Sequence, residues 1–244
     1  MDEILRHNIP FSPAPPQKKR RLKGEQGRDP YDGLRPWSAI THGVGALLAI
    51  LGTALLLVRA SGVGGALRMT VFAIYGASMI ALYLASTLYH CIRTSPAGRM
   101  NLRRIDHAAI CLLIAGSYTP VCLLSLKGWL GWGMFGIIWA LAAAGIALAL
   151  VWIMAPRWLT AGVYLAMGWL AIFAVYPLSQ VLSARGMVLL VLGGVLYTVG
   201  GVLYGLKWPG RSNPRFGCHE IFHLFILAGS IVHFLMMYQV IVYA

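Results

Sequence analysis

The sequence predicts an all-α protein in which seven transmembrane helices form one bundle, with the N-terminus in the cytoplasm and the C-terminus outside. Three observations lead to this prediction. Apolar residues make up 59% of the 244-residue chain and charged residues only 11%, whereas soluble domains carry roughly 25% charged residues. Apolar stretches of about 20 residues, the length that crosses a bilayer, recur from Trp37 onward. The basic residues between these stretches follow an alternating pattern that sets their direction.

Residues 1–36 are expected to be a disordered, basic cytoplasmic tail, separate from the seven-helix domain at 37–244. Four prolines lie between Pro10 and Pro16, and a basic run extends from Lys18 to Lys23. Such a segment cannot bury enough apolar surface to fold. It also lacks the apolar core and cleavage site of a signal peptide. Its basic residues are expected to fix the topology and to contact anionic lipid head groups.

The seven spans are assigned from apolar stretches joined by short links, so successive helices should be antiparallel neighbours. They are expected at Trp37–Val58, Leu67–His90, Ile105–Ser125, Trp129–Met154, Trp158–Leu182, Met187–Leu206 and His219–Tyr243. Pro120 and Pro177 fall inside spans, where a bundle tolerates kinks because neighbouring groups satisfy the freed backbone.

The orientation follows from the distribution of Lys and Arg. With the N-terminus inside, sixteen of the twenty basic residues face the cytoplasm, as the positive-inside rule requires. The sequence therefore predicts a multi-pass protein of the cell inner (plasma) membrane. The same distribution accounts for the net charge of +13 without nucleic acid as a partner, because no soluble basic face is formed. Nothing in the sequence indicates an oligomeric state.

Most of the ionisable residues of the spans gather at the cytoplasmic ends of their helices. Only two acids follow the tail, and ionisable groups at membrane depth are rare and usually functional. On the predicted topology these acids share one leaflet with five of the six histidines that follow the tail, His233 lying several turns deeper: Asp106, Glu220, His42, His90, His107, His219 and His223. This co-location is the strongest argument for a site.

The spacing of these residues indicates a zinc site. His219 and His223 are four residues apart and lie on one helix face, and His90 is expected at the same depth. Three neutral imidazoles with an open fourth position are typical of catalytic zinc. Asp106 would offset part of the Zn²⁺ charge, and Ser86 lies one turn before His90. Each histidine alone would more often be a helix-packing hydrogen bonder, and Ser86 could bond back to its own helix.

Residues 219–223 also read His-Glu-Ile-Phe-His, the HExxH pattern of zinc proteases, in which the glutamate is the general base. An intramembrane metalloprotease is therefore an alternative, with Glu220 as the base. That interpretation requires a third ligand from elsewhere in the chain.

Several ordered motifs resemble the haemolysin III family, the bacterial branch of the progestin and adipoQ receptors, which is more distantly similar to alkaline ceramidases. The motifs are Ile40–Gly43, Ser86–His90, Ile105–Ala109, Ile114–Pro120, His219–Phe225 and Ala228–Phe234. The resemblance extends from Trp37 to the C-terminus and implies a seven-helix fold with zinc held by three histidines. Carried over by motif, the ligands are His90, His219 and His223. Glu220 is not part of the wider pattern.

The resemblance also implies roles for two further residues. Asp106 would hold or activate the zinc water, and Ser86 would lie beside the ligands or on the oxyanion side. The function expected first is a zinc-dependent hydrolase that cleaves a membrane lipid amide, such as a ceramide-like lipid, by a metal-bound hydroxide. The alternatives are a non-enzymatic lipid-state sensor or receptor with structural zinc, and a cytolysin. Seven apolar spans argue against a cytolysin, since they commit the chain to its own membrane.

Overall fold

The computed structural model describes residues 34–126, 128–209 and 216–244, and the predicted tail lies almost wholly outside them. These residues form eight α-helices and three short segments of other helix types: α1 (Pro36–Val63), α2 (Ala66–Cys91), α3 (Pro96–Pro120), η1 (Val121–Ser125), α4 (Gly128–Val151), α5 (Arg157–Trp169), η2 (Leu170–Ala174), α6 (Val175–Val181), α7 (Ala184–Leu206), α8 (Cys218–Gln239) and η3 (Ile241–Tyr243). Together they make seven helical spans that are long and apolar enough to cross a membrane. The predicted all-α, seven-span architecture is confirmed.

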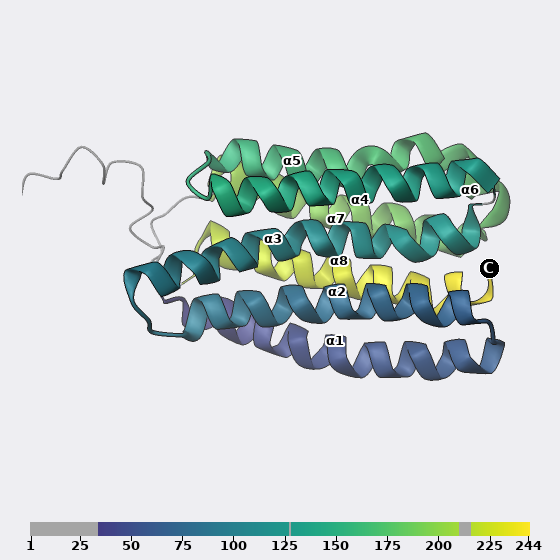
Figure 1. Ribbon diagram of the computed structural model, residues 1–244, viewed down its shortest axis with the longest axis horizontal. Helices are drawn as coiled ribbons and strands as arrows, with labels where there is room; N and C mark the ends of the chain where they lie inside the picture. The colour runs from purple at the N-terminus through teal and green to yellow at the C-terminus, as the bar shows by residue number, and fades with distance from the viewer. Residues whose placement is uncertain (1–33, 127, 210–215) are drawn as a thin grey trace, which may run out of the picture. The chain divides into compact units, whose positions relative to one another are not determined.

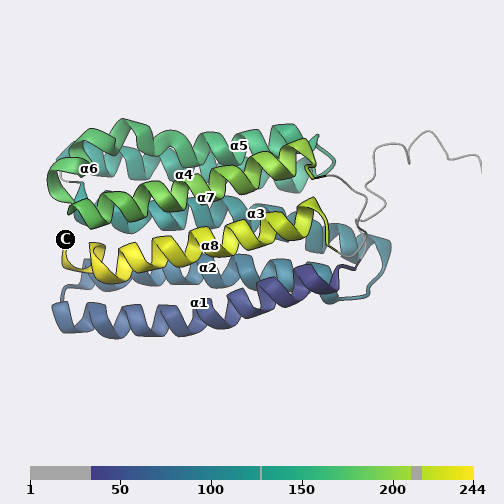
Figure 2. The ribbon, with the colours of Figure 1, turned by 180° about the vertical axis from the view of Figure 1, so that it is seen from behind.

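The spans run alongside one another (Figures 1 and 2), and their contacts connect them in a ring. Helix α2 packs between α1 and α3, α4 packs on α3, and α5 connects α4 to α7. Helix α8 then packs on both α7 and α1. The last span therefore lies beside the first, and residues of α2 and α8 can meet inside the bundle. The end of the bundle at which α1 and α8 begin and α2 ends is called the site end below.

The third span begins earlier than its apolar stretch predicts. Its helix starts at Pro96 rather than Ile105, and the Ser95 side chain accepts a hydrogen bond from the Gly98 backbone N–H at 3.2 Å. A serine cap followed by proline at the first helical position is a strong start signal. The first turns contain Arg99 and two further arginines, so hydropathy alone misses them.

The fifth span is interrupted, as Pro177 suggested. Helix α5 gives way to the 3₁₀ segment η2 before α6 begins. A proline has no backbone N–H to donate to the carbonyl four residues before it, so Pro177 weakens the helix at this point. The hydroxyl of Tyr118 lies at this break, where it donates to the Gly168 carbonyl at 2.6 Å and accepts from the Ala171 N–H at 2.7 Å. A side chain of α3 thus satisfies backbone groups that the irregular span leaves open.

Close packing of α2 against α3 depends on Gly116. A Cβ at this position would lie 2.6 Å from Ser78 Cβ and still closer to Ser78 Oγ. We expect Gly116→Ala to lower the stability of the bundle by about 1–3 kcal/mol, because an overpacked core must move its backbone. Thermal unfolding of the purified protein in detergent measures this loss.

Gly136→Ala is the matched control, because a Cβ on Gly136 of α4 meets no atom within 4 Å. If both substitutions changed the melting temperature equally, the contact between α2 and α3 would not be the cause.

Candidate metal centre

Two histidines project from the first turns of α8 toward the inside of the bundle. His219 and His223 are one turn apart, so their rings lie on the same helix face, with ring centroids 4.6 Å apart. The helix begins directly after Gly217, where the Glu220 carboxylate accepts a hydrogen bond from the Gly217 N–H at 2.8 Å. This capping by a side chain three residues on fixes where the helix starts, and hence the direction of both imidazoles.

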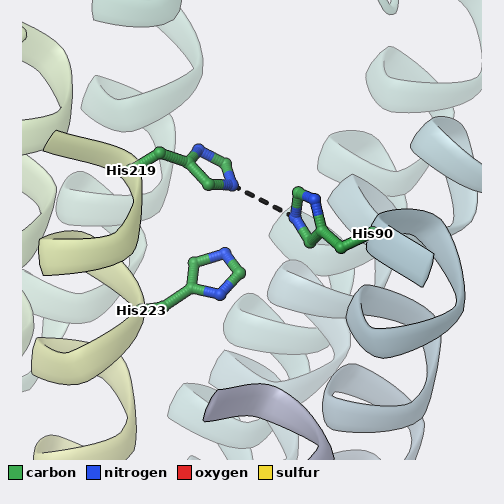
Figure 3. A group of neighbouring side chains, drawn as sticks. All are labelled: His90, His219 and His223. Carbon is green, nitrogen blue, oxygen red and sulfur yellow. Dashed lines mark hydrogen bonds between the residues drawn. The ribbon is translucent and has the colours of Figure 1, made fainter. Parts of the chain in front are cut away.

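The third histidine comes from the last turn of α2. His90 Nε2 lies 3.1 Å from His219 Nε2, and the ring centroids of His90 and His223 are 5.1 Å apart. Figure 3 shows the three rings turned toward one another from the two helices. One ligand atom from each residue lies within 4.8 Å of the others. Residues separated by more than a hundred positions in the sequence thus meet as the zinc prediction requires.

The three imidazoles could hold a metal ion, and the spacing of one pair can be compared with that of a zinc site. Zinc–nitrogen bonds of 2.0–2.1 Å in a tetrahedral site place neighbouring nitrogens about 3.3 Å apart, close to the distance between the two Nε2 atoms. His90 and His223 are buried, and the Nδ1 atom of each has no hydrogen-bond partner among the described residues. The cluster therefore keeps unpaired ring nitrogens beside the hydrogen bond between His90 and His219, and it could hold a metal ion.

A fourth histidine supports the cluster from α1. The buried ring of His42 stacks on His223 with centroids 3.6 Å apart and planes 13° apart, and the Tyr83 ring meets His42 edge-on at 5.1 Å. The sequence placed His42 at the same depth but could not decide between a ligand and a packing role. The stacking places His42 against His223, one of the three residues (His90, His219 and His223) that are called the metal-ligand group below.

The predicted acid and serine share one cavity with two of the three histidines, His219 and His223. A cavity of about 260 Å³ is lined at the site end by Ser86, Asp106, His219 and His223. Ser86 and Asp106 are both buried. His107 also lines the cavity, and its carbonyl accepts a hydrogen bond from the Tyr164 hydroxyl at 3.3 Å. The structure therefore brings every predicted site residue to the same end of the bundle.

Glu220, the central residue of the HExxH pattern, has other partners. One oxygen of its buried carboxylate accepts hydrogen bonds from Arg35 Nη1 at 2.9 Å and from Ser38 Oγ at 3.1 Å, and the other accepts from the Gly217 N–H. These four residues are called the Glu220 clamp. A carboxylate committed to three donors is occupied in holding helices together, which disfavours its use as a protease base.

The clamp also reaches the helix that carries His90. The backbone N–H of Arg35 donates to the carbonyl oxygen of His90 at 3.1 Å. Arg35 therefore joins the end of α2 to the start of α8 through one residue. Sequence reasoning counted Arg35 only as a topology signal, and no pattern linked it to Glu220, because the two residues are 185 positions apart.

Fold and site together define a polytopic membrane protein with a three-histidine group, two members of which line a cavity in the bundle. A family model described as "Haemolysin-III related" matches residues 36–234. Hemolysin-3 of Bacillus cereus is 41% identical over 199 residues, which cover 81% of this chain and 87% of the relative. The Hemolysin-3 homolog of Bacillus subtilis (strain 168) is 44% identical over 197 residues, covering 81% of this chain and 89% of the relative.

The chain therefore belongs to the haemolysin III family, and the resemblance found in its motifs is confirmed. Family membership and seven apolar helices make it a multi-pass membrane protein.

Proposed function

We propose that this protein is a zinc-dependent hydrolase that cleaves an amide bond in a membrane lipid. The observation that carries the proposal is the cavity, which His219 and His223 of the three-histidine group line at one end together with a buried carboxylate, Asp106, and Ser86, while most of the remaining lining is apolar. Apolar pockets with a few converging polar groups are the usual form of small-molecule sites. Polar groups at one end and apolar walls beyond them match an amphiphile.

A route for such a substrate lies on the side of the bundle. Trp169, Ile172 and Val175, on the interrupted fifth span, and Val191 and Val195, on α7, line the cavity and are also exposed on the outside of the helices. In a membrane these residues would face lipid chains. A lipid could then enter between the two spans with its head toward the histidines.

The chemistry needs a proton acceptor and a donor to the reacting carbonyl. A zinc ion held by His90, His219 and His223 would supply Lewis-acid activation of water and substrate. Asp106 would take a proton from the attacking water and pass it to the amide nitrogen as the carbon–nitrogen bond breaks. Ser86 would donate its hydroxyl hydrogen to the developing oxyanion. The products are a fatty acid and a free amine.

Hydrolysis of a ceramide-like N-acyl lipid by the purified protein in lipid nanodiscs tests the proposal. We expect turnover in the wild type, and losses of about 10²–10⁴-fold in Asp106→Asn, the range that general acid–base groups contribute. His219→Ala should lose turnover together with its zinc. Release of the fatty acid, followed by mass spectrometry, is the measurement.

Cys91→Ser is the control, since Cys91 adjoins His90 but is exposed and lies outside the metal-ligand group. Equal turnover in Asp106→Asn, His219→Ala and wild type would contradict the proposal. Stoichiometric zinc without turnover of any N-acyl lipid would instead favour a lipid-state sensor with structural zinc.

A further inference from the structure

A second polar group adjoins the cavity, and two of its three residues line it. His233 of α8 and Tyr197 of α7 both line the cavity, and their rings meet edge to face with centroids 5.3 Å apart. The Tyr197 hydroxyl and Ser230 Oγ are 2.9 Å apart. Neither the zinc chemistry nor the capping of α8 uses these three residues.

His233 presents an acceptor without a partner. Its Nε2 lies 3.3 Å from the Leu190 carbonyl oxygen, so Nε2 must carry the hydrogen of a neutral ring that makes this bond. Nδ1 is then a lone-pair acceptor, and it is buried with no hydrogen-bond partner among the described residues. A buried acceptor left unpaired destabilises the protein, because it has lost its hydrogen bond to water. The site is therefore suited to a ligand that donates a hydrogen bond.

Glycines make the space that holds both rings. A Cβ on Gly193 would lie 3.1 Å from Cγ of His233 and closer still to Cδ2 and Nε2, so this edge of the ring faces α7 and Nδ1 lies on the opposite edge. A Cβ on Gly229 would lie 2.7 Å from Cε1 of Tyr197. Any larger residue at either position would displace a ring. The two rings are thus fixed between α7 and α8, with Nδ1 directed away from the α7 backbone.

We propose that His233, Tyr197 and Ser230 form a subsite for a hydroxyl group on the acyl chain of the lipid. The inference rests on the proposed function, because it assumes that the chain's carbonyl lies at the metal centre. Ten residues of α8 separate His223 from His233, which is about 15 Å along the helix. An extended chain advances about 1.3 Å per bond, so the hydroxyl would lie about twelve carbons from the carbonyl.

The direction of the hydrogen bond makes the subsite selective. A hydroxyl group donates its hydrogen to Nδ1 of His233, and its oxygen can accept the Tyr197 hydroxyl hydrogen when Ser230 is the donor of the Tyr197–Ser230 bond. A keto oxygen at the same carbon has no hydrogen to give. An unsubstituted chain would leave Nδ1 unpaired.

Displacement of a fluorescent fatty acid from the zinc-loaded protein in nanodiscs tests this subsite without requiring turnover. The competitors are octadecanoic acid and its hydroxy and keto derivatives, substituted about twelve carbons from the carboxyl. We expect the hydroxy acid to bind up to about tenfold more tightly than the other two, since one hydrogen bond contributes about 0.5–1.5 kcal/mol. His233→Phe, which keeps a ring but no nitrogen, should abolish this preference.

Tyr197→Phe is a milder second variant that should reduce the preference, and Thr198→Val is the matched control. Thr198 also lines the cavity, but its hydroxyl donates to the Gly194 carbonyl at 2.7 Å and accepts from Trp169 Nε1 at 3.1 Å. The control should keep the wild-type preference.

Equal binding of the hydroxy and keto acids would overturn the subsite, as would an undiminished preference in both His233→Phe and Tyr197→Phe. Either result would leave the hydrolase proposal standing if the N-acyl lipid is still turned over. Failure of every fatty acid to displace the probe would overturn the subsite and also remove support for the hydrolase.

Discussion

Replacing any one of His90, His219 and His223 with alanine is expected to reduce bound zinc from about one equivalent per chain to nearly none. The three imidazoles come from two helices, and one ligand atom of each lies within 4.8 Å of the others. Loss of one leaves two protein ligands, too few for a stable zinc site, in which three or four are usual. Elemental analysis of the protein, purified in detergent and dialysed against dilute zinc, measures the ratio.

Two variants at the same end of the bundle separate ligation from general damage. His107→Ala removes an imidazole that lines the same cavity but lies outside the metal-ligand group. Cys91→Ser removes the thiol next to His90. Both should keep about one equivalent of zinc, with helical content equal to that of wild type by circular dichroism. Zinc retained in His223→Ala, or lost in Cys91→Ser, would show that the ligands are different ones.

Glu220→Ala is expected to give the largest loss of stability of any single change at the site end. The substitution leaves the Arg35 guanidinium, whose side chain is only 12% exposed, without the carboxylate that lies 2.9 Å away. Breaking a buried ion pair by removing one partner typically costs about 3–5 kcal/mol. It also removes the acceptor of the Gly217 N–H, so the start of α8 should fray and zinc should bind more weakly. Thermal unfolding with and without zinc measures both effects.

A double-mutant cycle isolates the clamp. If Arg35 and Glu220 act as a pair, Arg35→Ala combined with Glu220→Ala should cost less than the sum of the single changes. Glu220→Gln should be milder, because the amide oxygen can still accept hydrogen bonds. Strict additivity would contradict the clamp, and loss of hydrolysis in a stable, zinc-loaded Glu220→Gln protein would favour Glu220 over Asp106 as the general base, as the HExxH pattern suggests.

The spans could be predicted because their cause is local. A stretch of apolar residues without acids has few alternatives to a transmembrane helix, whatever its neighbours are. Their limits were less accurate where the cause was not hydropathy. The helix of the third span extends back through Arg99 to Pro96 because a capping serine and a proline start it, and Val63 lies five residues beyond the predicted end of the first span.

The site could be predicted in part, because topology and local spacing also follow from the sequence. The topology gave the depth of His90, His219 and His223, and the i, i+4 spacing gave a shared face for two of them. Depth does not say which helices are neighbours around the ring, so the stacking of His42 on His223 and the partner of Glu220 could not be derived. The cavity also depends on side-chain packing between the interrupted fifth span and α7, which no sequence pattern encodes.

The position of the proposed zinc ligands in the chain has a consequence for how the protein is made. His90 leaves the ribosome with the second span, whereas His219 and His223 follow 129 and more residues later with the last one. The complete ligand set therefore exists only after the final helix has inserted and found its place beside the first. Zinc acquisition would be the closing event of biogenesis, and a chain truncated before α8 would be unable to hold the ion. A bound ion would also stabilise the finished bundle by mass action, so zinc-loaded molecules would outlast incompletely assembled ones under membrane quality control.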